Sequence, residues 1–515
     1  MRPLLRRAVL ACLVPAGFLL VVSPACAEKG AIVFFEQHYL NGNRAGDAQI
    51  AALGLSVSGK LTWPAGKGVV EVAGRQGYVQ RAPVAIRDAA GGAIVAFEAE
   101  ARSGSSAGDT DIWAQRVDAS GKLLWNDGAG PVVIAGSALA ETDPVIVSDS
   151  GGGAIVVYAR RPKGGDDSQT VIQAQRLSAS GALVWSAPVE VVSAEEGVTV
   201  APKAVAAPDG VGGVIVAYEI TYTSGDYAGD RDLSAQRISQ GGDRLWPTED
   251  MGVSVSSSKG IERNAVLVPD GSGGVIAIYE IEFRSGDNAG DCDILAQRVS
   301  GDGKLLWNEG ERSAFISSGT ALERSVVALP DGKGGALVAC EAEFREGDHK
   351  GDIDVLAQRV SADGTLLWNK GESSALVASS RWRERNPVMV TDGRGGAIII
   401  FEQHAPPDAY AGDIDLASER ITADGEIPWS TEENRAVDIS DKDDYLERAP
   451  AAAPDGSDGA IVVFEAEARI GKQAGRADLL AQRFDASGKP LWNSGSPITL
   501  ASGDTSDKHP VVVVP

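Results

Sequence analysis

The chain is poor in the residues from which catalytic and metal centres are most often built. Among its 515 residues are four cysteines, four histidines and three methionines. It contains no H-E-x-x-H motif and no paired C-x-x-C motif, which removes two common sequence signs of a zinc site. Beyond the N-terminal segment only Cys292 and Cys340 remain, at different positions of neighbouring repeats, so nothing in their placement indicates a disulfide.

Positive charge and long apolar runs are also scarce. The chain has 47 basic and 71 acidic residues, a net charge of −24. A surface this acidic repels nucleic acid and anionic lipid, and it favours cations or basic partners. No stretch after residue 27 approaches the ~20 apolar residues that a membrane-spanning helix needs. We therefore expect no nucleic-acid ligand and no transmembrane helix.

The N-terminus has the pattern of a secretory signal. Three arginines precede an apolar run from Ala8 to Val22, and Ala25-Cys26-Ala27 forms an A-x-A cleavage site. We predict a signal peptide over residues 1–27, export to the periplasm, cell surface or medium, and one mature domain over 28–515. Removing residues 1–27 takes away three arginines and no acid, so the net charge becomes −27. A lipid anchor on Cys26 is the alternative, although Ser23 stands where an aliphatic residue would be expected.

A unit of about 61 residues is repeated eight times. It reads, with variation, PxVVxDGxGGAIVAYE, then GDxDILAQRVSADGKLLWN. A period of this length with strand-like content is typical of an array of small sheets. The clearest landmark is one tryptophan per repeat: Trp63, Trp125, Trp185, Trp246, Trp307, Trp368, Trp429 and Trp492.

One repeat can be divided into four strands. Strands are expected at Ser325–Pro330, Ala336–Glu343 and Ile353–Val360, and a fourth should begin with Thr365–Trp368. The turns between them contain the glycines that tight hairpins need. No segment has an amphipathic helical period, so the fold class is all-β.

Four antiparallel strands repeated about eight times predict an eight-bladed β-propeller. The mature chain begins at a second strand, Gly30–Glu36, and ends with a lone first strand, His509–Pro515. The two fragments add up to one blade, so pairing of the N- and C-terminal strands would close the ring and remove its exposed edges. An open solenoid, the rival architecture, would more often end in distinct capping repeats.

The DGxGG turn and the AQR…ASGxLLW strand pair give the chain a family resemblance. From Gly30 to Pro515 it resembles the propeller repeats of many exported bacterial proteins, and it is similar in blade logic to kelch proteins. It departs from kelch in repeat length and in lacking the double-glycine strand ending. The resemblance implies a fold and no single activity.

Two sets of repeated side chains suggest ion pairs. The arginines of the AQR motif and the glutamates that follow the second-strand aromatics are expected to pair across strands or blades. The alternative is an acidic ring that holds a basic ligand. The eight tryptophans are expected to pack between blades. The candidate binding residues are Glu280, Glu341, Glu402, Glu465 and Trp382, the last an extra aromatic between arginines.

The glycine-rich loops after each second strand are acidic. Clustered carboxylates in such a loop could bind Ca²⁺, yet their spacing is not that of the helix-flanked calcium loop, and Asp also caps turns. Calcium is the one cofactor considered. The candidate ligands are Asp226, Asp230, Asp232, Asp287, Asp291, Asp293, Asp348, Asp352, Asp354, Asp413 and Asp415.

Topology places the long loops on one face of the disc and the short turns on the other. We predict an exported, monomeric binding module that uses its acidic long-loop face to bind a protein or glycan. One alternative is an extracellular polysaccharide hydrolase or lyase, for which abundant carboxylates are the only sign. Another is a calcium-stabilised structural protein of the envelope. His38 and His404 share a repeat position but would lie two blades apart, so catalysis is the less favoured interpretation.

Overall fold

The computed structural model describes residues 30–63, 68–165, 167–247, 251–380, 382–406, 412–429, 436–440 and 444–514, apart from the side chain of Asp348. The predicted signal peptide, with Cys26, lies outside these residues. Among the residues described, no helix is long and apolar enough to cross a membrane.

The chain folds almost entirely into short antiparallel strands, as predicted. A representative unit contains β21 (Leu322–Pro330), β22 (Ala336–Glu343), β23 (Ile353–Val360) and β24 (Ala375–Ala378). The second and third strands have the predicted bounds. The fourth begins at Ala375 rather than at Thr365, because Trp368 opens a 3-10 turn in which Asn369 has a φ of 47°. That left-handed turn interrupts the chain before it returns to pair with β23.

The other strands repeat this scheme. In chain order they are β1 (Ala31–Tyr39), β2 (Ala48–Leu55), β3 (Val69–Glu71), β4 (Tyr78–Arg87), β5 (Ala93–Ala101), β6 (Thr110–Val117), β7 (Val132–Ala135), β8 (Ala140–Ser148), β9 (Ala154–Arg161), β10 (Val171–Leu177), β11 (Val189–Ser193), β12 (Val198–Val200), β13 (Val205–Pro208), β14 (Val214–Tyr222), β15 (Arg231–Ile238), β16 (Val253–Ser256), β17 (Gly260–Pro269), β18 (Val275–Phe283), β19 (Cys292–Val299), β20 (Ala314–Ser317), β25 (Arg383–Thr391), β26 (Ala397–His404), β27 (Ile414–Ile421), β28 (Val437–Ser440), β29 (Tyr445–Pro454), β30 (Ala460–Ala468), β31 (Ala477–Phe484), β32 (Ile498–Ala501) and β33 (Thr505–Val513). Single 3-10 turns link some of them: η1 (Gly42–Arg44), η2 (Trp125–Gly128), η3 (Asp167–Gln169), η4 (Trp307–Gly310), η5 (Gly347–His349), η6 (Trp368–Gly371), η7 (Gly471–Gln473) and η8 (Asn493–Gly495).

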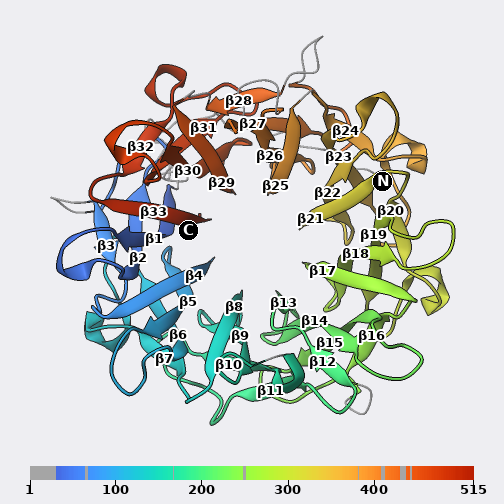
Figure 1. Cartoon of the computed structure of the whole chain (residues 1–515), viewed down its shortest axis with the longest axis horizontal. Helices are drawn as coiled ribbons and strands as arrows, with labels where there is room; N and C mark the ends of the chain where they lie inside the picture. Colours follow the sequence, from blue (N-terminus) through green and yellow to red (C-terminus); the bar gives the residue numbers. More distant parts are fainter. Residues whose placement is uncertain are drawn as a thin grey trace, which may run out of the picture.

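The strands surround a central opening in a β-propeller-like arrangement (Figure 1). The first strand of each unit lies nearest the opening: β33, β4, β8, β13, β17, β21, β25 and β29. The two ends of the chain meet in one sheet, because β1 pairs with β33 in antiparallel fashion, Ile32 opposite Val513. This strand pairing is the one predicted from the two incomplete terminal repeats.

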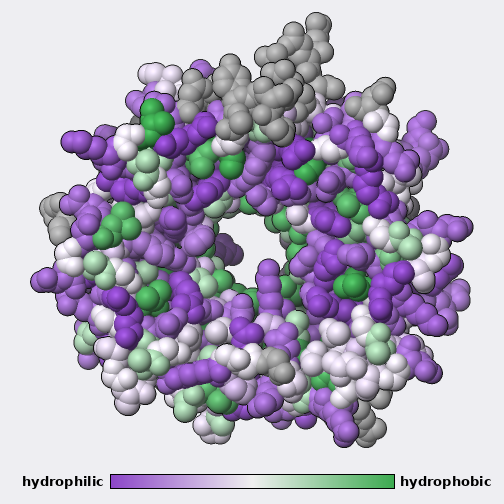
Figure 2. Space-filling model, viewed as in Figure 1, coloured by the Kyte–Doolittle hydropathy of each residue, from purple (hydrophilic) through white to green (hydrophobic). Residues whose placement is uncertain are grey.

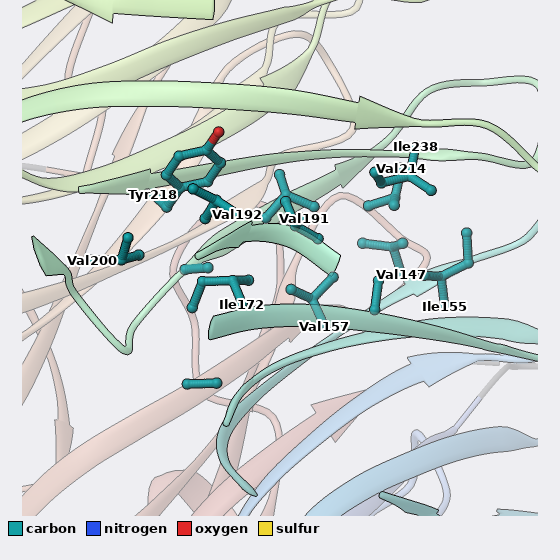
Figure 3. Close-up of a cluster of buried hydrophobic side chains, with 14 of the residues drawn as sticks. Val147, Ile155, Val157, Ile172, Val191, Val192, Val200, Val214, Tyr218 and Ile238 are labelled. Carbon is teal, nitrogen blue, oxygen red and sulfur yellow. The ribbon is translucent and has the colours of Figure 1, made fainter. Parts of the chain in front are cut away.

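Buried aliphatic and aromatic side chains fill the spaces between neighbouring sheets. Figure 3 shows one such cluster, in which Val157 and Ile172 of one sheet face Val214 and Tyr218 of the next. Each second strand is apolar on both faces, because both faces pack against other sheets. A second cluster joins the two ends of the chain, since Leu53 is buried together with Ile461 and other residues of β30 to β32.

The repeated tryptophans pack between units, as predicted. Trp307 is 2% exposed, and its indole N–H donates to the carbonyl oxygen of Ala362 in the next unit at 3.0 Å. Gly364, from the same turn, lies so close to the Trp307 ring that an added Cβ would approach it to 3.1 Å. A glycine with φ of 88° is therefore required there twice over, by the turn and by the ring.

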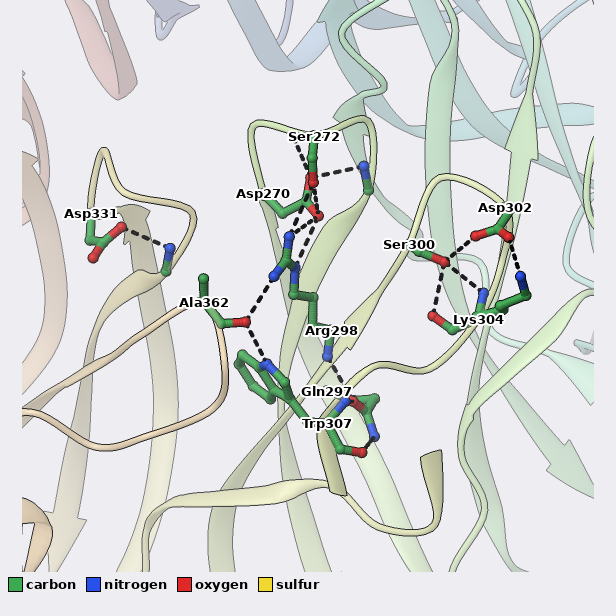
Figure 4. A network of polar contacts seen from close by, with 12 residues as sticks. Asp270, Ser272, Gln297, Arg298, Ser300, Asp302, Lys304, Trp307, Asp331 and Ala362 are labelled. Atoms are coloured by element: carbon green, nitrogen blue, oxygen red, sulfur yellow. Dashed lines mark hydrogen bonds and ion pairs between the residues drawn. The ribbon is translucent and has the colours of Figure 1, made fainter. Parts of the chain in front are cut away.

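The AQR arginines do not pair with the second-strand glutamates, which corrects the prediction. Arg298 donates to Asp270 of the DGxGG turn at 2.9 Å and to the carbonyl of Ala362 at 2.8 Å (Figure 4). The register explains this, because Arg298 lies opposite Ile276, near the DGxGG end of β18, whereas Glu280 lies nearer the other end. The equivalent pairs are Arg116–Asp88, Arg176–Asp149, Arg237–Asp209, Arg359–Asp331, Arg420–Asp392 and Arg483–Asp455.

Candidate functional site

Seven of the innermost strands carry a β-bulge at the same point of the repeat, and in the remaining unit the strand is divided there into β12 and β13. In β17 the register with β18 shifts between Arg263 and Val266, and Asn264 within the bulge has a φ of 52°. A residue with a Cβ costs about 1–2 kcal/mol in this region of backbone space, and such strain gathers at functional sites. The equivalent residues with positive φ are Ala82, Asp143, Ser325, Asn386, Ala449 and His509.

A glutamate of the preceding unit, buried everywhere except at the half-buried Glu219, holds each of these bulges. Glu280 accepts a hydrogen bond from the backbone N–H of Ser325 in the next unit at 2.8 Å. This contact satisfies a donor that the bulge withdraws from the sheet ladder. The equivalent contacts are Glu36 to Ala82, Glu98 to Asp143, Glu219 to Asn264, Glu341 to Asn386, Glu402 to Ala449 and Glu465 to His509, all at 2.7–2.8 Å.

The second carboxylate oxygen faces a partner in its own unit. Oε2 of Glu280 accepts from Asn264 Nδ2 at 3.0 Å and from Arg263 Nε at 3.2 Å. The glutamates therefore link neighbouring first strands around the opening. The structure places the candidate binding residues Glu280, Glu341, Glu402 and Glu465 at four such positions, each at most 8% exposed. Ligand binding by these glutamates stays a prediction.

A cavity of about 700 Å³ opens along these inner strands. The bulge residues Asn264, Ser325, Asn386 and Ala449 of four successive units line it, together with Lys203 at the equivalent position between β12 and β13. Glu219, Glu280 and Glu402 also contribute to its wall. Figure 2 shows the molecule hollowed at its centre. The amide, hydroxyl and ammonium groups here place donors and acceptors on a wall that is otherwise largely aliphatic, for example at Val266, Val327 and Val388. The cavity is within the size range of small-molecule sites.

The repeat symmetry is broken where the chain ends meet. Glu36, 3% exposed, accepts from His38 Nε2 at 2.8 Å and lies 3.1 Å from His509 Nδ1. Burial alone would raise the pKa of Glu36, but its contacts with the two imidazoles and with the Ala82 N–H prevail and lower that pKa to about 2. The hydrogen bond to Glu36 raises the pKa of His509. This carboxylate is thus ionised at neutral pH and orients two imidazoles.

A second histidine occupies the same position in another unit with a different partner. His404 Nε2 lies 2.8 Å from Glu402, which also accepts from Asn386 Nδ2 at 2.8 Å. Asn386 therefore takes the place that His509 has beside Glu36. His38 and His404 each contact the glutamate two residues earlier in their own strand. Paired imidazoles on one carboxylate were missed in the sequence, because His509 lies 471 residues after His38.

The candidate calcium ligands separate into three environments. Asp226 and Asp287, at the loop tips, are exposed. The first aspartate of three G-D-x-D segments is instead paired with an arginine of the next unit. These pairs are Asp230–Arg284 at 2.7 Å, Asp291–Arg345 at 3.1 Å and Asp413–Arg469 at 2.9 Å. Asp352 lies 3.5 Å from His349, and the side chain of Asp348 is outside the described residues.

The second aspartate of the segment points toward the next unit. Parallel bridges between Arg231 and Ile261 and between Cys292 and Leu322 bring the third strand of one unit to the first strand of the next. Asp232 and Asp293 follow in these third strands, and each lies against a buried acid of the neighbouring first strand. The pairs are Asp232 with Glu262, Asp293 with Glu323, and Asp354 with Glu384.

These acid pairs have raised pKa values. Burial and then the neighbouring aspartates raise the pKa of Glu323 to about 8, and burial raises those of Glu262 and Glu384 to about 7. Sequence reasoning included the aspartates but missed the glutamates, which lie about 30 residues later in the chain. Across the residues that the structure describes, no group of three or more His, Cys, Asp or Glu side chains is arranged to hold a metal ion.

Trp382 and the cysteines lie apart from this site. Trp382 is half-buried before β25, and its backbone N–H donates to Ser380 Oγ at 2.9 Å. It is not part of the cavity wall. Cys292 and Cys340 are buried free thiols with raised pKa values, a result mainly of burial.

Comparison with known proteins shows no family. No protein-family model matches the chain, and no curated protein matches it. Solved structures that share part of its shape include the polysaccharide lyase Uly1 (10% identity, TM-score 0.41, 78% of this chain and 91% of that one). They also include an ulvan lyase of polysaccharide lyase family PL25 (12%, 0.37, 93% and 96%) and a sialidase of Trypanosoma rangeli (11%, 0.34, 83% and 56%). Similarity this low says nothing of function.

Proposed function

We propose that this protein is an exported, eight-bladed β-propeller that binds a carbohydrate in its central opening. Ring closure is supported at the terminal repeats, where Trp492 and Arg483 both donate to the carbonyl of Val57, at 2.8 and 2.9 Å. Each internal unit holds its neighbour by the same contact, for example through Trp307 and Ala362. This closure supports the prediction of one domain over residues 28–515.

The observation that carries the binding proposal is the chemistry of the bulge positions. Their shared structural role, a backbone N–H in the left-handed region, would be served best by glycine. The chain instead places Asn264, Ser325 and Asn386 there, three hydrogen-bonding side chains in successive units that face one cavity. Polar side chains at strained positions of a common wall support a role in ligand binding, beyond the contacts that Asn264 and Asn386 make with Glu280 and Glu402.

A hydroxyl-rich ligand fits this wall better than a charged one. Amides and hydroxyls can each donate and accept, which matches the alternating donors and acceptors of sugar hydroxyls. The negative charge of the chain disfavours polyanions. The long-loop face is the less favoured surface, because Asp230, Asp291 and Asp413 are each neutralised by an arginine of the next unit.

Binding to an immobilised panel of neutral glycans would identify the ligand class. The informative variants are Asn264→Gly and Asn386→Gly, since glycine keeps the backbone conformation and removes the side chain together with its one contact to Glu280 or Glu402. Ala449→Gly is the matched control, because it alters the same bulge position in the cavity without removing a polar group. Loss of glycan signal in both asparagine variants, with the control unchanged, supports the proposal. An unchanged signal in all three contradicts it.

Polysaccharide cleavage is a second candidate, favoured by the histidine pair on Glu36. An imidazole held by a buried carboxylate can accept or donate a proton, and two such rings could serve as acid and base. His509 is exposed on its inner strand, so a chain in the opening could reach it. New reducing ends or unsaturated products from a polysaccharide panel would support this activity. It is contradicted if products are absent, or if they persist unchanged in a His38→Gln, His509→Asn double variant.

A further inference from the structure

Buried acid pairs join neighbouring units at the ends of the third strands. Asp293 in β19 is 4% exposed and Glu323 in β21 is 2% exposed. Asp293 and Glu323 follow directly after Cys292 and Leu322, the two residues of the parallel bridge that connects their units. The pairs therefore lie in the contact between sheets, away from the cavity described above.

Asp293 and Glu323 lie near enough to hydrogen-bond each other when one of them is protonated. Within the described part of the chain, Oδ1 of Asp293 and Oε2 of Glu323 are both buried, and no other N–H or O–H group donates to them. The same is true of Asp354 Oδ1 with Glu384 Oε2, and of Glu262 Oε2. Glu262 and Glu384 are fully buried. Two ionised carboxylates cannot be buried together without a counter-charge, so a proton or a cation has to occupy each pair.

The two positions of the pair change together among the repeats. Where the first repeat lacks the aspartate it has Gln49, and the partner is Gln80, also buried. In the third repeat Val171 stands at the aspartate position and Ala201 at the glutamate position. The remaining junctions keep both acids: Asp111 with Glu141, Asp232 with Glu262, Asp293 with Glu323, Asp354 with Glu384, Asp415 with Glu447, and Asp478 with Asp507.

The residues found at these paired positions show whether acids are needed for the sheets to pack or for another purpose. An amide pair and an apolar pair both allow the sheets to meet, so acids are not needed for packing alone. Two facing carboxylates are retained at most junctions despite the cost of burying them. A retained cost of this kind is expected where the pair binds something that amides and aliphatic groups do not.

We propose that these interblade acid pairs bind divalent cations, with Ca²⁺ the best match. Calcium takes oxygen ligands in flexible geometry and accepts carboxylates together with hydroxyl, main-chain and water oxygens. Serines supply hydroxyls at the same places: Ser256 and Ser258 contact Glu262, at 3.1 and 2.5 Å, and Ser380 contacts Glu384 at 2.6 Å. Each junction offers two carboxylates, so neutral oxygens would complete the shell. The inference does not depend on carbohydrate binding.

This proposal changes which of the loop aspartates are expected to bind calcium. Asp230 and Asp291 are engaged by arginines, and the site moves to the second aspartate of each segment and the glutamate of the next unit. Because the proposed sites cross unit boundaries, bound cations would stabilise the ring as a whole.

The test measures cation binding and thermal unfolding of residues 28–515 at pH 8. Calcium titration by calorimetry gives the number of sites, and unfolding is compared in Ca²⁺, in Mg²⁺ and in EDTA. The variant is Asp293→Asn with Glu323→Gln, an amide pair that the chain already tolerates at Gln49 and Gln80. Asp302→Asn is the matched control, since Asp302 is exposed and contacts Lys304 on the surface.

The expected result is binding of several calcium ions, a higher melting temperature in Ca²⁺ than in EDTA, and one site fewer in the double variant. The control should bind as many ions as the unaltered protein. Absence of binding would overturn the proposal. If stability instead falls as pH rises, without any effect of Ca²⁺, the pairs share protons and the proposal is wrong.

Discussion

The indole N–H of Trp492 lies 2.8 Å from the carbonyl oxygen of Val57, a residue 435 positions earlier in the chain. Nη1 of Arg483 reaches the same oxygen at 2.9 Å. Inside the chain, Trp307 and Arg298 make the same pair of contacts with Ala362. The junction between the chain ends thus uses the same contacts as the junctions between adjacent repeats.

Replacing Trp492 by Phe should therefore cost as much stability as replacing Trp307 by Phe. Each change removes one buried hydrogen bond and a little ring surface, worth about 1–2 kcal/mol. Urea unfolding, monitored by circular dichroism, compares the two variants. If Trp492→Phe has no effect while Trp307→Phe destabilises the protein, the ends are not joined as described.

Arginine removal should have a larger effect. Arg483→Met leaves Asp455, 3% exposed, without its ionic partner, and a stranded buried charge costs about 3–5 kcal/mol. Addition of Asp455→Asn should recover part of that loss, because the orphan charge is gone. A double variant as unstable as Arg483→Met alone would show that the pair matters through packing instead.

The strain at the bulges can be measured where no side-chain function competes. Ala82 and Ala449 have φ near 50°, so glycine at either position should stabilise the fold by about 0.5–1 kcal/mol. Ala85→Gly, in the regular part of β4, is the control and should destabilise by a similar amount. Equal losses at Ala82 and Ala85 would contradict the backbone assignment.

Glu419 stands where six other repeats have a buried glutamine. Gln297 accepts from the backbone N–H of Trp307 at 3.0 Å and donates to Arg312 O at 3.2 Å. Glu419 is 1% exposed, and burial raises its pKa to about 8. Glu419→Gln should stabilise the protein by about 1–3 kcal/mol at pH 8, because no carboxylate is then buried. An unchanged melting temperature at that pH would contradict a buried carboxyl.

Glu36 and His509 should make the stability of the fold depend on pH in opposite directions. The pKa of Glu36 is lowered to about 2 from 4.5, so its contribution is complete above pH 4.5 and disappears as pH falls toward 2. The pKa of His509 is raised, so its contribution is complete below its unfolded pKa and is lost as pH rises through the folded one. His509→Asn, which reproduces the Asn386–Glu402 contact, should remove the second dependence and reduce the first. Unfolding curves between pH 3 and 9 measure both, and superimposable profiles would contradict this assignment.

Local pattern was enough to predict the strands, and it was not enough to predict pairing partners. Ala336–Glu343 and Ile353–Val360 alternate and end at glycine turns, so their bounds follow from the sequence. The predicted start of the fourth strand was wrong because the turn after Trp368 places Asn369 and Lys370 in the left-handed region. Left-handed backbone at non-glycine residues is not evident from the sequence. Arg298 pairs with Asp270 rather than Glu280 because the strand register places it at the DGxGG end of β18. Register depends on the whole sheet and not on the local sequence.

Only part of the candidate site could be predicted, because the rest depends on backbone conformation rather than on repeated residues. The glutamates were identified by their repetition, and the structure adds the bulge residues that they hold. Those residues vary from Ala to His among repeats, so no repeated letter marks them. The shared property is a positive φ, which becomes visible only in the backbone.

Affinity of the mature protein for its best neutral oligosaccharide, before and after Asn264→Gly with Asn386→Gly, tests the central claim most directly. Carbohydrate binding in the opening predicts at least a tenfold loss, which corresponds to about 1.4 kcal/mol, with little change in melting temperature. Unaltered affinity in a folded double variant would place the ligand elsewhere and contradict the account.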